Sequence, residues 1–145
     1  MADAPLKTRD FSDDTEVEAL VAAFENAAIS PGDFCHAAHM AVALSYLSRF
    51  ALPEAAEQMR SSLLKFTAHH GVDVYHETLT TFWMRLLDHL ARKRYRDLPL
   101  WRRINLIVDR YATAGMVDAH YSPAVLRTTN ARREWVAPDR EPIPF

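Results

Sequence analysis

Apolar residues recur every three or four positions along most of the sequence, which is the period of one face of an α-helix. Valine and isoleucine form no alternating run of the kind that a half-buried β-strand requires. The three glycines all fall near the expected ends of helices, and alanine, leucine, arginine and glutamate dominate the composition. The sequence therefore predicts an all-α fold.

The periodic segments and their start and stop signals predict a bundle of about five helices. Ser30 and Pro31 form a helix start, Gly71 and Gly115 are expected C-terminal caps, and Pro99 breaks the chain. Short connections favour antiparallel neighbours, and an irregular C-terminal segment is expected to follow the helices. The expected helices span about residues 13–28, 31–50, 53–70, 74–95 and 100–114.

Length and composition are those of one soluble globular domain. The chain has 145 residues, of which 49% are hydrophobic and 25% are charged. We expect a flexible N-terminal arm over residues 1–12 and a single helical domain over residues 13–145. Cys35 is the only cysteine, so an internal disulfide is impossible and a reducing, cytoplasmic setting is expected.

Charge and hydropathy argue against two kinds of partner. No apolar run approaches the roughly 18 residues that a membrane-spanning helix needs, so no membrane partner is expected. The net charge of −2 argues against a surface built for nucleic acid. The segment 92–103 is basic and could bind an anion. Basic residues are also expected near a helix C-terminus, because they interact favourably with the helix dipole.

Two histidines lie three residues apart in the stretch DFCHAAHM, inside a segment that otherwise has the pattern of a buried helix. His36 and His39 both fall on its apolar face. The second and third expected helices cover nearly equal lengths in opposite directions, so His70 should return to the same end. The fourth helix begins a few residues later and brings His76 there. The sequence thus predicts four histidines at one end of the bundle.

Converging imidazoles are a donor set for a transition metal. Imidazole nitrogens bind iron, copper, zinc and manganese, and two histidines three residues apart on a helix can share one ion. We predict His36, His39 and His76 as ligands of one divalent transition metal. His70 or Glu77 is expected to be a further ligand or to act as the acid or base.

The function predicted from this constellation is that of a small metal-dependent enzyme. Its metal would act as a Lewis acid, or would activate water or dioxygen. The substrate is expected to be a small, partly apolar molecule. The residues expected to line its pocket are Tyr46, Tyr75, Thr80, Phe82 and Trp83.

Two alternatives place the same residues in a protein without catalysis. One is an accessory or sensor protein that binds a metal or a small ligand. The other is a structural helical domain, because a single histidine on an apolar face is most often a hydrogen-bonded core residue. A homo-oligomer is compatible with the enzyme and with both of these alternatives.

Four segments resemble a group of small, largely uncharacterised bacterial helical proteins. They are FCHAAH (34–39), AHHG (68–71), YHETLTTFW (75–83) and YSPAVLRTTNARREWVAPD (121–139). The group is marked by the patterns F-x-H-x-x-H, Y-H-E-T and Y-S…A-R…W-V-x-P-D. The resemblance extends from residue 34 over about three quarters of the chain. It supports grouping the same histidines together and implies no particular reaction.

Overall fold

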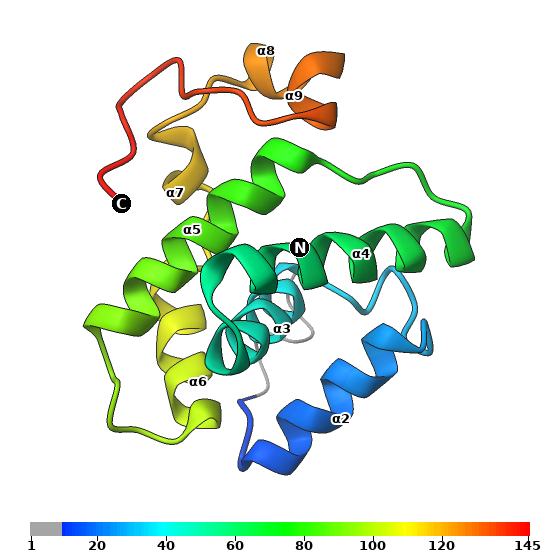
Figure 1. Ribbon diagram of the computed structural model, residues 1–145, viewed down its shortest axis with the longest axis vertical. Coiled ribbons are helices and arrows are strands. Elements are labelled where there is room, and N and C mark those ends of the chain that lie inside the picture. The colour runs from blue at the N-terminus through cyan, green and yellow to red at the C-terminus, as the bar shows by residue number, and fades with distance from the viewer. Residues whose placement is uncertain (1–9) are drawn as a thin grey trace.

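The computed structural model describes residues 10–145, and all regular secondary structure in this part of the chain is helical (Figure 1). The predicted all-α class is therefore confirmed. Three short helices near the C-terminus are α7 (Gly115–Asp118), α8 (Pro123–Leu126) and α9 (Thr129–Arg133). The five longer helices are α2 (Asp14–Glu25), α3 (His36–Arg49), α4 (Leu52–His70), α5 (Glu77–Lys93) and α6 (Leu100–Tyr111).

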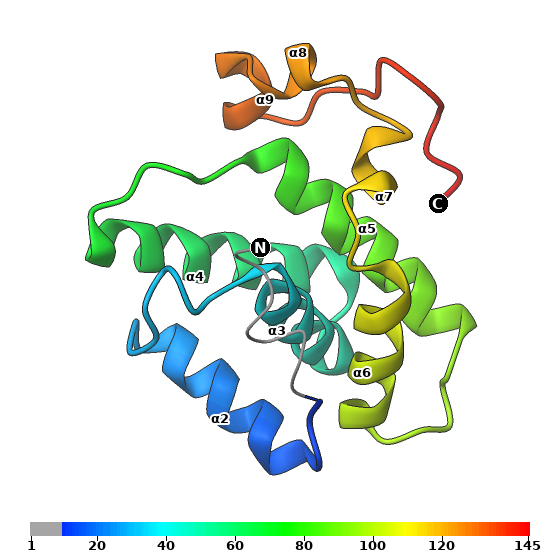
Figure 2. The same ribbon diagram turned by 180° about the vertical axis from the view of Figure 1, so that it is seen from behind.

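Helix α3 lies at the centre of the fold. It contacts α2, α4, α5 and α6, and both views show it among these four helices (Figures 1 and 2). Most of its residues are buried, including four alanines. A helix that is apolar around most of its surface is expected in a protein interior, and small side chains let neighbouring helices approach closely. Ala37, Ala38, Ala41 and Ala43 supply those small side chains.

The start of α3 differs from the prediction. Residues 31–34 form a single turn, in which the backbone N–H groups of Asp33 and Phe34 bond to the Ser30 carbonyl. Cys35 is then extended, and the helix begins at His36. Phe34 is buried and stacks on Phe24, with 4.4 Å between the ring centroids. The predicted helix start at residue 31 is therefore wrong. The chain breaks the helical conformation at Cys35, and this break lets Phe34 enter the core.

The connection from α4 to α5 shapes the region that the sequence singled out. Gly71 is the C-terminal cap of α4, with a φ of 66°, and this prediction is confirmed. Residues 72–75 are irregular, and His76 is the N-cap of α5, so this helix begins slightly later than predicted. Gly115, the other predicted cap, is instead the first residue of α7.

The C-terminal segment packs against α5 (Figure 1). The fully buried hydroxyl of Thr78 donates to the Glu134 carbonyl at 2.9 Å and accepts from the Val136 N–H at 3.2 Å. The Tyr121 hydroxyl donates to the Val136 carbonyl at 2.6 Å. The irregular segment is therefore fixed to α5 by buried hydrogen bonds as well as by apolar contacts.

The N-terminal arm falls only partly within the described residues. Residues 1–9 of the predicted flexible arm lie outside them. Phe11 is tied to α6 by two hydrogen bonds: its N–H donates to the Asn105 side-chain oxygen, and its carbonyl accepts from the Asn105 amide group. Within residues 10–145, none of the helices has the length and apolar character required to cross a membrane.

Candidate functional site

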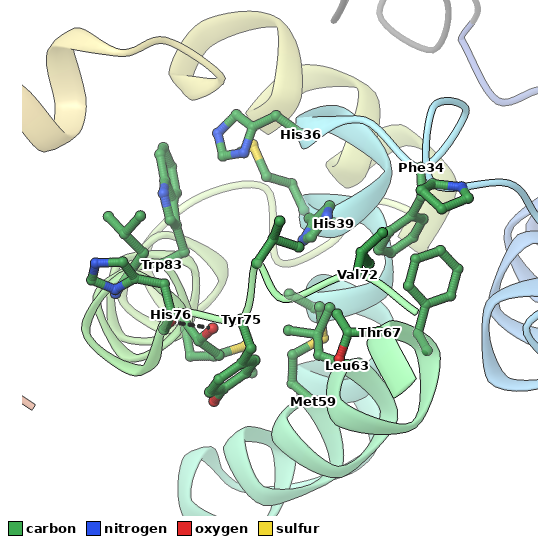
Figure 3. A pocket seen from close by; sticks show the side chains of 18 of the residues that line it. Phe34, His36, His39, Met59, Leu63, Thr67, Val72, Tyr75, His76 and Trp83 are labelled. Atoms are coloured by element: carbon green, nitrogen blue, oxygen red, sulfur yellow. Dashed lines mark hydrogen bonds between the residues drawn. The ribbon is translucent and has the colours of Figure 1, made fainter. Parts of the chain in front are cut away.

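A pocket of about 380 Å³ lies between α3, α4 and α5 (Figure 3). The α4–α5 connection contributes to its wall through Val72 and Val74. Pockets of this size are typical of small-molecule sites, which are mostly apolar with a few polar groups. Its apolar wall includes Phe34, Met40, Leu63, Phe66, Trp83 and Met84.

The pocket contains six of the ten residues predicted for the site. The four that do not line it are Tyr46, His70, Glu77 and Phe82. The six that line it are His36, His39, Tyr75, His76, Thr80 and Trp83.

His39 is the most strongly perturbed group of the pocket. Its ring lies 4.2 Å from the Phe34 ring, between centroids. Burial lowers the pKa of His39 to about 4, and the nearby His36 acts in the same direction, while a hydrogen bond with the Phe34 backbone opposes them. The imidazole of His39 is therefore neutral near pH 7, with one nitrogen as donor and the other as acceptor.

His36 lies at the same end of the pocket as His39, one helical turn earlier on α3 (Figure 3). Its ring meets the Trp83 indole edge to face, with 4.5 Å between the centroids. The start of α3 and the beginning of α5 are thus in contact across the pocket.

His76 has a different environment. Its Nδ1 accepts the Leu79 N–H at 3.2 Å, which caps α5, and its Nε2 lies 2.8 Å from the Leu126 carbonyl oxygen. Because Nδ1 accepts, the ring proton is on Nε2 and is donated to Leu126. Both nitrogens are occupied. In this arrangement neither nitrogen is available to a metal ion, and the ligand role of His76 stays a prediction.

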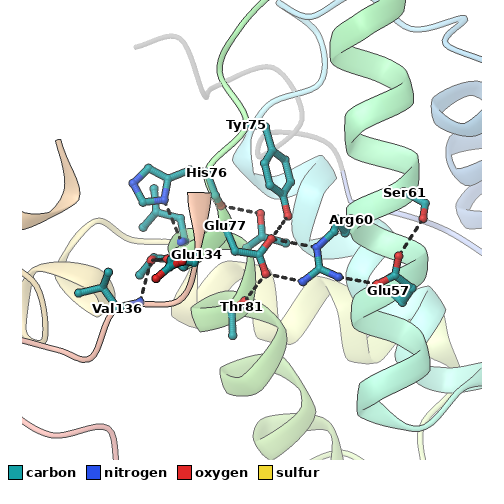
Figure 4. A network of polar contacts seen from close by, with 12 residues as sticks. Glu57, Arg60, Ser61, Tyr75, His76, Glu77, Thr81, Glu134 and Val136 are labelled. Atoms are coloured by element: carbon teal, nitrogen blue, oxygen red, sulfur yellow. Dashed lines mark hydrogen bonds and ion pairs between the residues drawn. The ribbon is translucent and has the colours of Figure 1, made fainter. Parts of the chain in front are cut away.

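Glu77 is held in a network of polar contacts between α4 and α5 (Figure 4). Its carboxylate accepts two hydrogen bonds from Arg60, one from Tyr75 at 2.6 Å and one from Thr81 at 3.3 Å. The Arg60 guanidinium, aided by Tyr75 and Thr81, holds the pKa of Glu77 below its usual range despite burial. An ionised carboxylate with four donors is poorly suited to the acid/base role predicted for it.

His70 ends α4 without lining the pocket, although Phe66 and Thr67, one turn earlier, do line it. Its ring contacts Phe66 at 4.5 Å and His69 at 4.9 Å, between centroids. Its Nε2 is buried and has no hydrogen-bond partner among the described residues. The predicted catalytic role of His70 therefore has no support from its position.

Tyr46 and Phe82 belong to the core. The Tyr46 hydroxyl donates to Glu25 at 2.7 Å and lies 3.1 Å from the Ser62 hydroxyl, and burial raises the pKa of Tyr46 to about 12. Phe82 of α5 packs against the C-terminal segment, at His120 and Tyr121. Tyr46 is two turns beyond His39, and Phe82 points about 100° away from its neighbour Trp83, so neither reaches the pocket.

The described residues contain no group of three or more His, Cys, Asp or Glu side chains placed to hold a metal ion. His36 and His39 are close together, but His76 is directed to Leu126 and Glu77 to Arg60. The three-histidine set predicted from the sequence is therefore not assembled in this arrangement.

Most of the apolar pocket wall could not be predicted from the sequence. Met59, Leu63 and Phe66 follow the helical period of α4, which made them indistinguishable from core residues. The loop residues Val72 and Val74 carried one usable signal. Their alternation in the stretch GVDVY indicates an extended connection, which separates the ends of α4 and α5 and leaves room between them.

The comparisons with known proteins leave the function to be argued from the pocket. Neither a scan against models of protein families nor searches of curated proteins and of solved structures found a match to the chain.

Proposed function

We propose that this protein binds a small, mainly apolar molecule in the pocket between α3, α4 and α5. The observation that supports this is the pocket itself, with a volume of about 380 Å³ and a largely apolar wall. In this proposal the five longer helices form a single-domain bundle, and the pocket is its binding site. The protein then acts as a ligand-binding accessory or sensor protein.

The composition of the wall suits such a ligand. Met40, Met59 and Met84 come from three different helices. Methionine side chains are flexible and polarisable, so they adapt to ligands of irregular shape and make favourable contacts with aromatic rings. Phe34 and Trp83 add aromatic surface at the end where the two α3 histidines lie (Figure 3).

A metal-dependent enzyme is the less supported candidate. His36 and His39 are the two predicted ligands that remain close to each other on one helix. The third ligand and the predicted base, His76 and Glu77, have their polar atoms bound to other partners. A catalytic metal site commonly uses three protein ligands, and binding of an ion here would require His76 to leave Leu126 and Leu79.

Binding can be tested with N-phenyl-1-naphthylamine, a neutral apolar dye whose fluorescence rises in apolar surroundings. We expect a saturable rise with the wild-type protein. Thr67→Trp places a large side chain in the pocket wall and should abolish it. Leu64→Trp is the matched control, because Leu64 is on the same helix, is 45% exposed and does not line the pocket.

Two results would contradict the proposal. One is the absence of a saturable fluorescence change with the wild-type protein. The other is equal affinity for the dye in the Thr67→Trp and Leu64→Trp variants, which would place the dye elsewhere. Circular dichroism of both variants checks that the helices are retained.

A further inference from the structure

The pocket has no charged wall. Among the described residues that line it, none is Asp, Glu, Lys or Arg. The charged pair of Arg60 and Glu77, which bonds to Tyr75 of the pocket wall, is engaged in its own network (Figure 4). A carboxylate, phosphate or ammonium group in this pocket would lose its hydration without gaining an opposite charge, which is strongly unfavourable. The pocket therefore selects an uncharged ligand.

His39 offers a hydrogen-bond acceptor to this apolar space. The bond between His39 and the Phe34 backbone favours the protonated ring, which identifies the backbone group as the carbonyl and the imidazole N–H as the donor. Since a neutral imidazole has one N–H and one lone pair, the second nitrogen of His39 is an acceptor.

The hydroxyl groups of the pocket do not supply a donor to His39. The Thr67 hydroxyl donates to the Leu64 carbonyl at 3.1 Å, and the Thr80 hydroxyl donates to the His76 carbonyl at 2.9 Å. The Tyr75 hydroxyl donates to Glu77 at 2.6 Å.

Two ring donors of α5 and its N-cap also line the pocket. The His76 N–H is donated to Leu126, and the Trp83 ring meets His36. A ligand in the pocket displaces water from this nitrogen, so a ligand that brings its own donor gains a hydrogen bond that an otherwise identical ligand cannot make.

We propose that the ligand is an uncharged aromatic molecule with a phenolic hydroxyl group, and that this hydroxyl donates a hydrogen bond to His39. This inference rests on the proposed function of the pocket. The aromatic ring of such a ligand would lie among Phe34, Phe66, Trp83 and the three methionines, which suit a flat polarisable partner. His39 is then the residue that determines specificity for the hydroxyl group.

Three naphthalene compounds of similar shape separate the contributions. 2-Naphthol has the hydroxyl donor, 2-methoxynaphthalene has the same oxygen without a donor, and naphthalene-2-sulfonate has a permanent charge. We expect isothermal titration calorimetry at pH 7 to give about tenfold tighter binding of 2-naphthol than of 2-methoxynaphthalene. The sulfonate should show no measurable binding in the pocket.

Variants connect the preference to His39. His39→Phe removes the acceptor and keeps a ring of similar size, so it should bind 2-naphthol and 2-methoxynaphthalene equally. Retained binding of 2-methoxynaphthalene shows that this variant is folded. His69→Phe is the matched control, because His69 is exposed and does not line the pocket, and the tenfold preference should persist.

A measurement on the wild-type protein avoids any folding defect of the variant. In ¹⁵N spectra of the histidine rings, 2-naphthol should shift the unprotonated nitrogen of His39, whereas 2-methoxynaphthalene should leave it nearly unchanged. An unmoved His39 signal with bound 2-naphthol would overturn the inference.

The outcomes distinguish this inference from the proposed function. Equal wild-type affinity for 2-naphthol and 2-methoxynaphthalene, or tighter binding of the sulfonate, overturns the hydroxyl specificity and leaves the apolar pocket as a binding site. If the dye binds and none of the naphthalene compounds binds, the hydroxyl specificity is likewise overturned and the pocket remains a binding site. If neither the dye nor any of these compounds binds, both proposals are overturned.

Discussion

The Nε atom of Arg60 lies 3.0 Å from a carboxylate oxygen of Glu77, and this contact joins the middle of α4 to the first residue of α5 (Figure 4). The same oxygen accepts the Tyr75 hydroxyl, whose ring lines the pocket. The network therefore fixes the α4–α5 connection, which forms one wall of the pocket. A change that breaks it should affect both stability and binding.

Replacing Glu77 with glutamine tests this contact. Glu77→Gln removes the charge that pairs with Arg60 and one acceptor of the Tyr75 hydroxyl, in a residue that is only 9% exposed. We expect a loss of about 1–3 kcal/mol in the free energy of unfolding, measured by urea denaturation. Glu57→Gln is the control, because Glu57 also pairs with Arg60 but is well exposed, and it should cost less than about 1 kcal/mol. Equal losses would contradict the role of Glu77.

The cap of α5 gives a second prediction. His76→Ala removes the acceptor of the Leu79 N–H and the donor to Leu126, and should cost about 1–2 kcal/mol in the free energy of unfolding. His76→Asn keeps a good N-cap side chain but is too short to reach Leu126. Thermal denaturation should therefore place the asparagine variant between the wild type and the alanine variant. If the His76→Ala and His76→Asn variants are equally unstable, the N-cap hydrogen bond makes no measurable contribution to stability.

His76 was predictable in its position and not in its contacts. Spacing along the helices placed His36, His39 and His76 near one pocket, and all three line it. The direction of the His76 ring depends on Leu126, which is 50 residues away in the sequence. No helical period indicates such a contact, so the position of His76 beside the pocket was predictable and the hydrogen bond of its ring to Leu126 was not.

At the start of α3, a contact between separate segments decides where the helix begins. The sequence contains a good helix start at Ser30 and Pro31, and a turn does form there. The chain leaves the helical conformation at Cys35, which allows Phe34 to stack on Phe24. Packing of side chains from separate segments prevailed over the local signal, whereas Gly71 was predictable because its cap geometry is local.

The low pKa of His39 predicts how stability depends on pH. The folded protein takes up this proton only near pH 4, whereas an unfolded chain takes it up near 6.5. The unfolded state therefore binds more protons between these values, and stability falls as the pH is lowered from about 6.5 towards 4, by at most about 1.4 kcal/mol per pH unit from this group. Urea denaturation at pH 7, 6 and 5 measures the slope.

The contribution of His39 to that slope needs a control, because other groups titrate in the same range. His39→Gln cannot take up the proton, so its stability should depend less steeply on pH between 7 and 5 than that of the wild type. Parallel curves for the two proteins would show that His39 is not the group responsible. Glu77 adds its own loss at lower pH, because a carboxyl group with a lowered pKa stabilises the fold above about 4.5.

Metal content provides a further prediction. Because both ring nitrogens of His76 are engaged, we expect His76→Ala to leave the metal content of the protein unchanged. Elemental analysis of protein purified without a histidine tag should find no stoichiometric iron, copper, zinc or manganese, before or after incubation with each metal. Near-stoichiometric metal that is lost in both His36→Ala and His76→Ala would instead support the metal-dependent enzyme. His89→Ala is the control for that comparison, because His89 does not line the pocket.

The attachment of the C-terminal segment to α5 depends on one hydroxyl group. Thr78 is fully buried, and its hydroxyl donates to the Glu134 carbonyl and accepts from the Val136 N–H. Thr78→Val keeps the shape of the side chain but leaves both backbone groups without this partner, so the free energy of unfolding should fall by about 1–3 kcal/mol. Hydrogen exchange at Val136 should become faster than in the wild type. Thr81→Val is the control, because Thr81 is only partly buried and makes a longer bond of 3.3 Å to Glu77. Unchanged exchange at Val136 in the Thr78 variant would show that apolar packing alone holds the segment on α5.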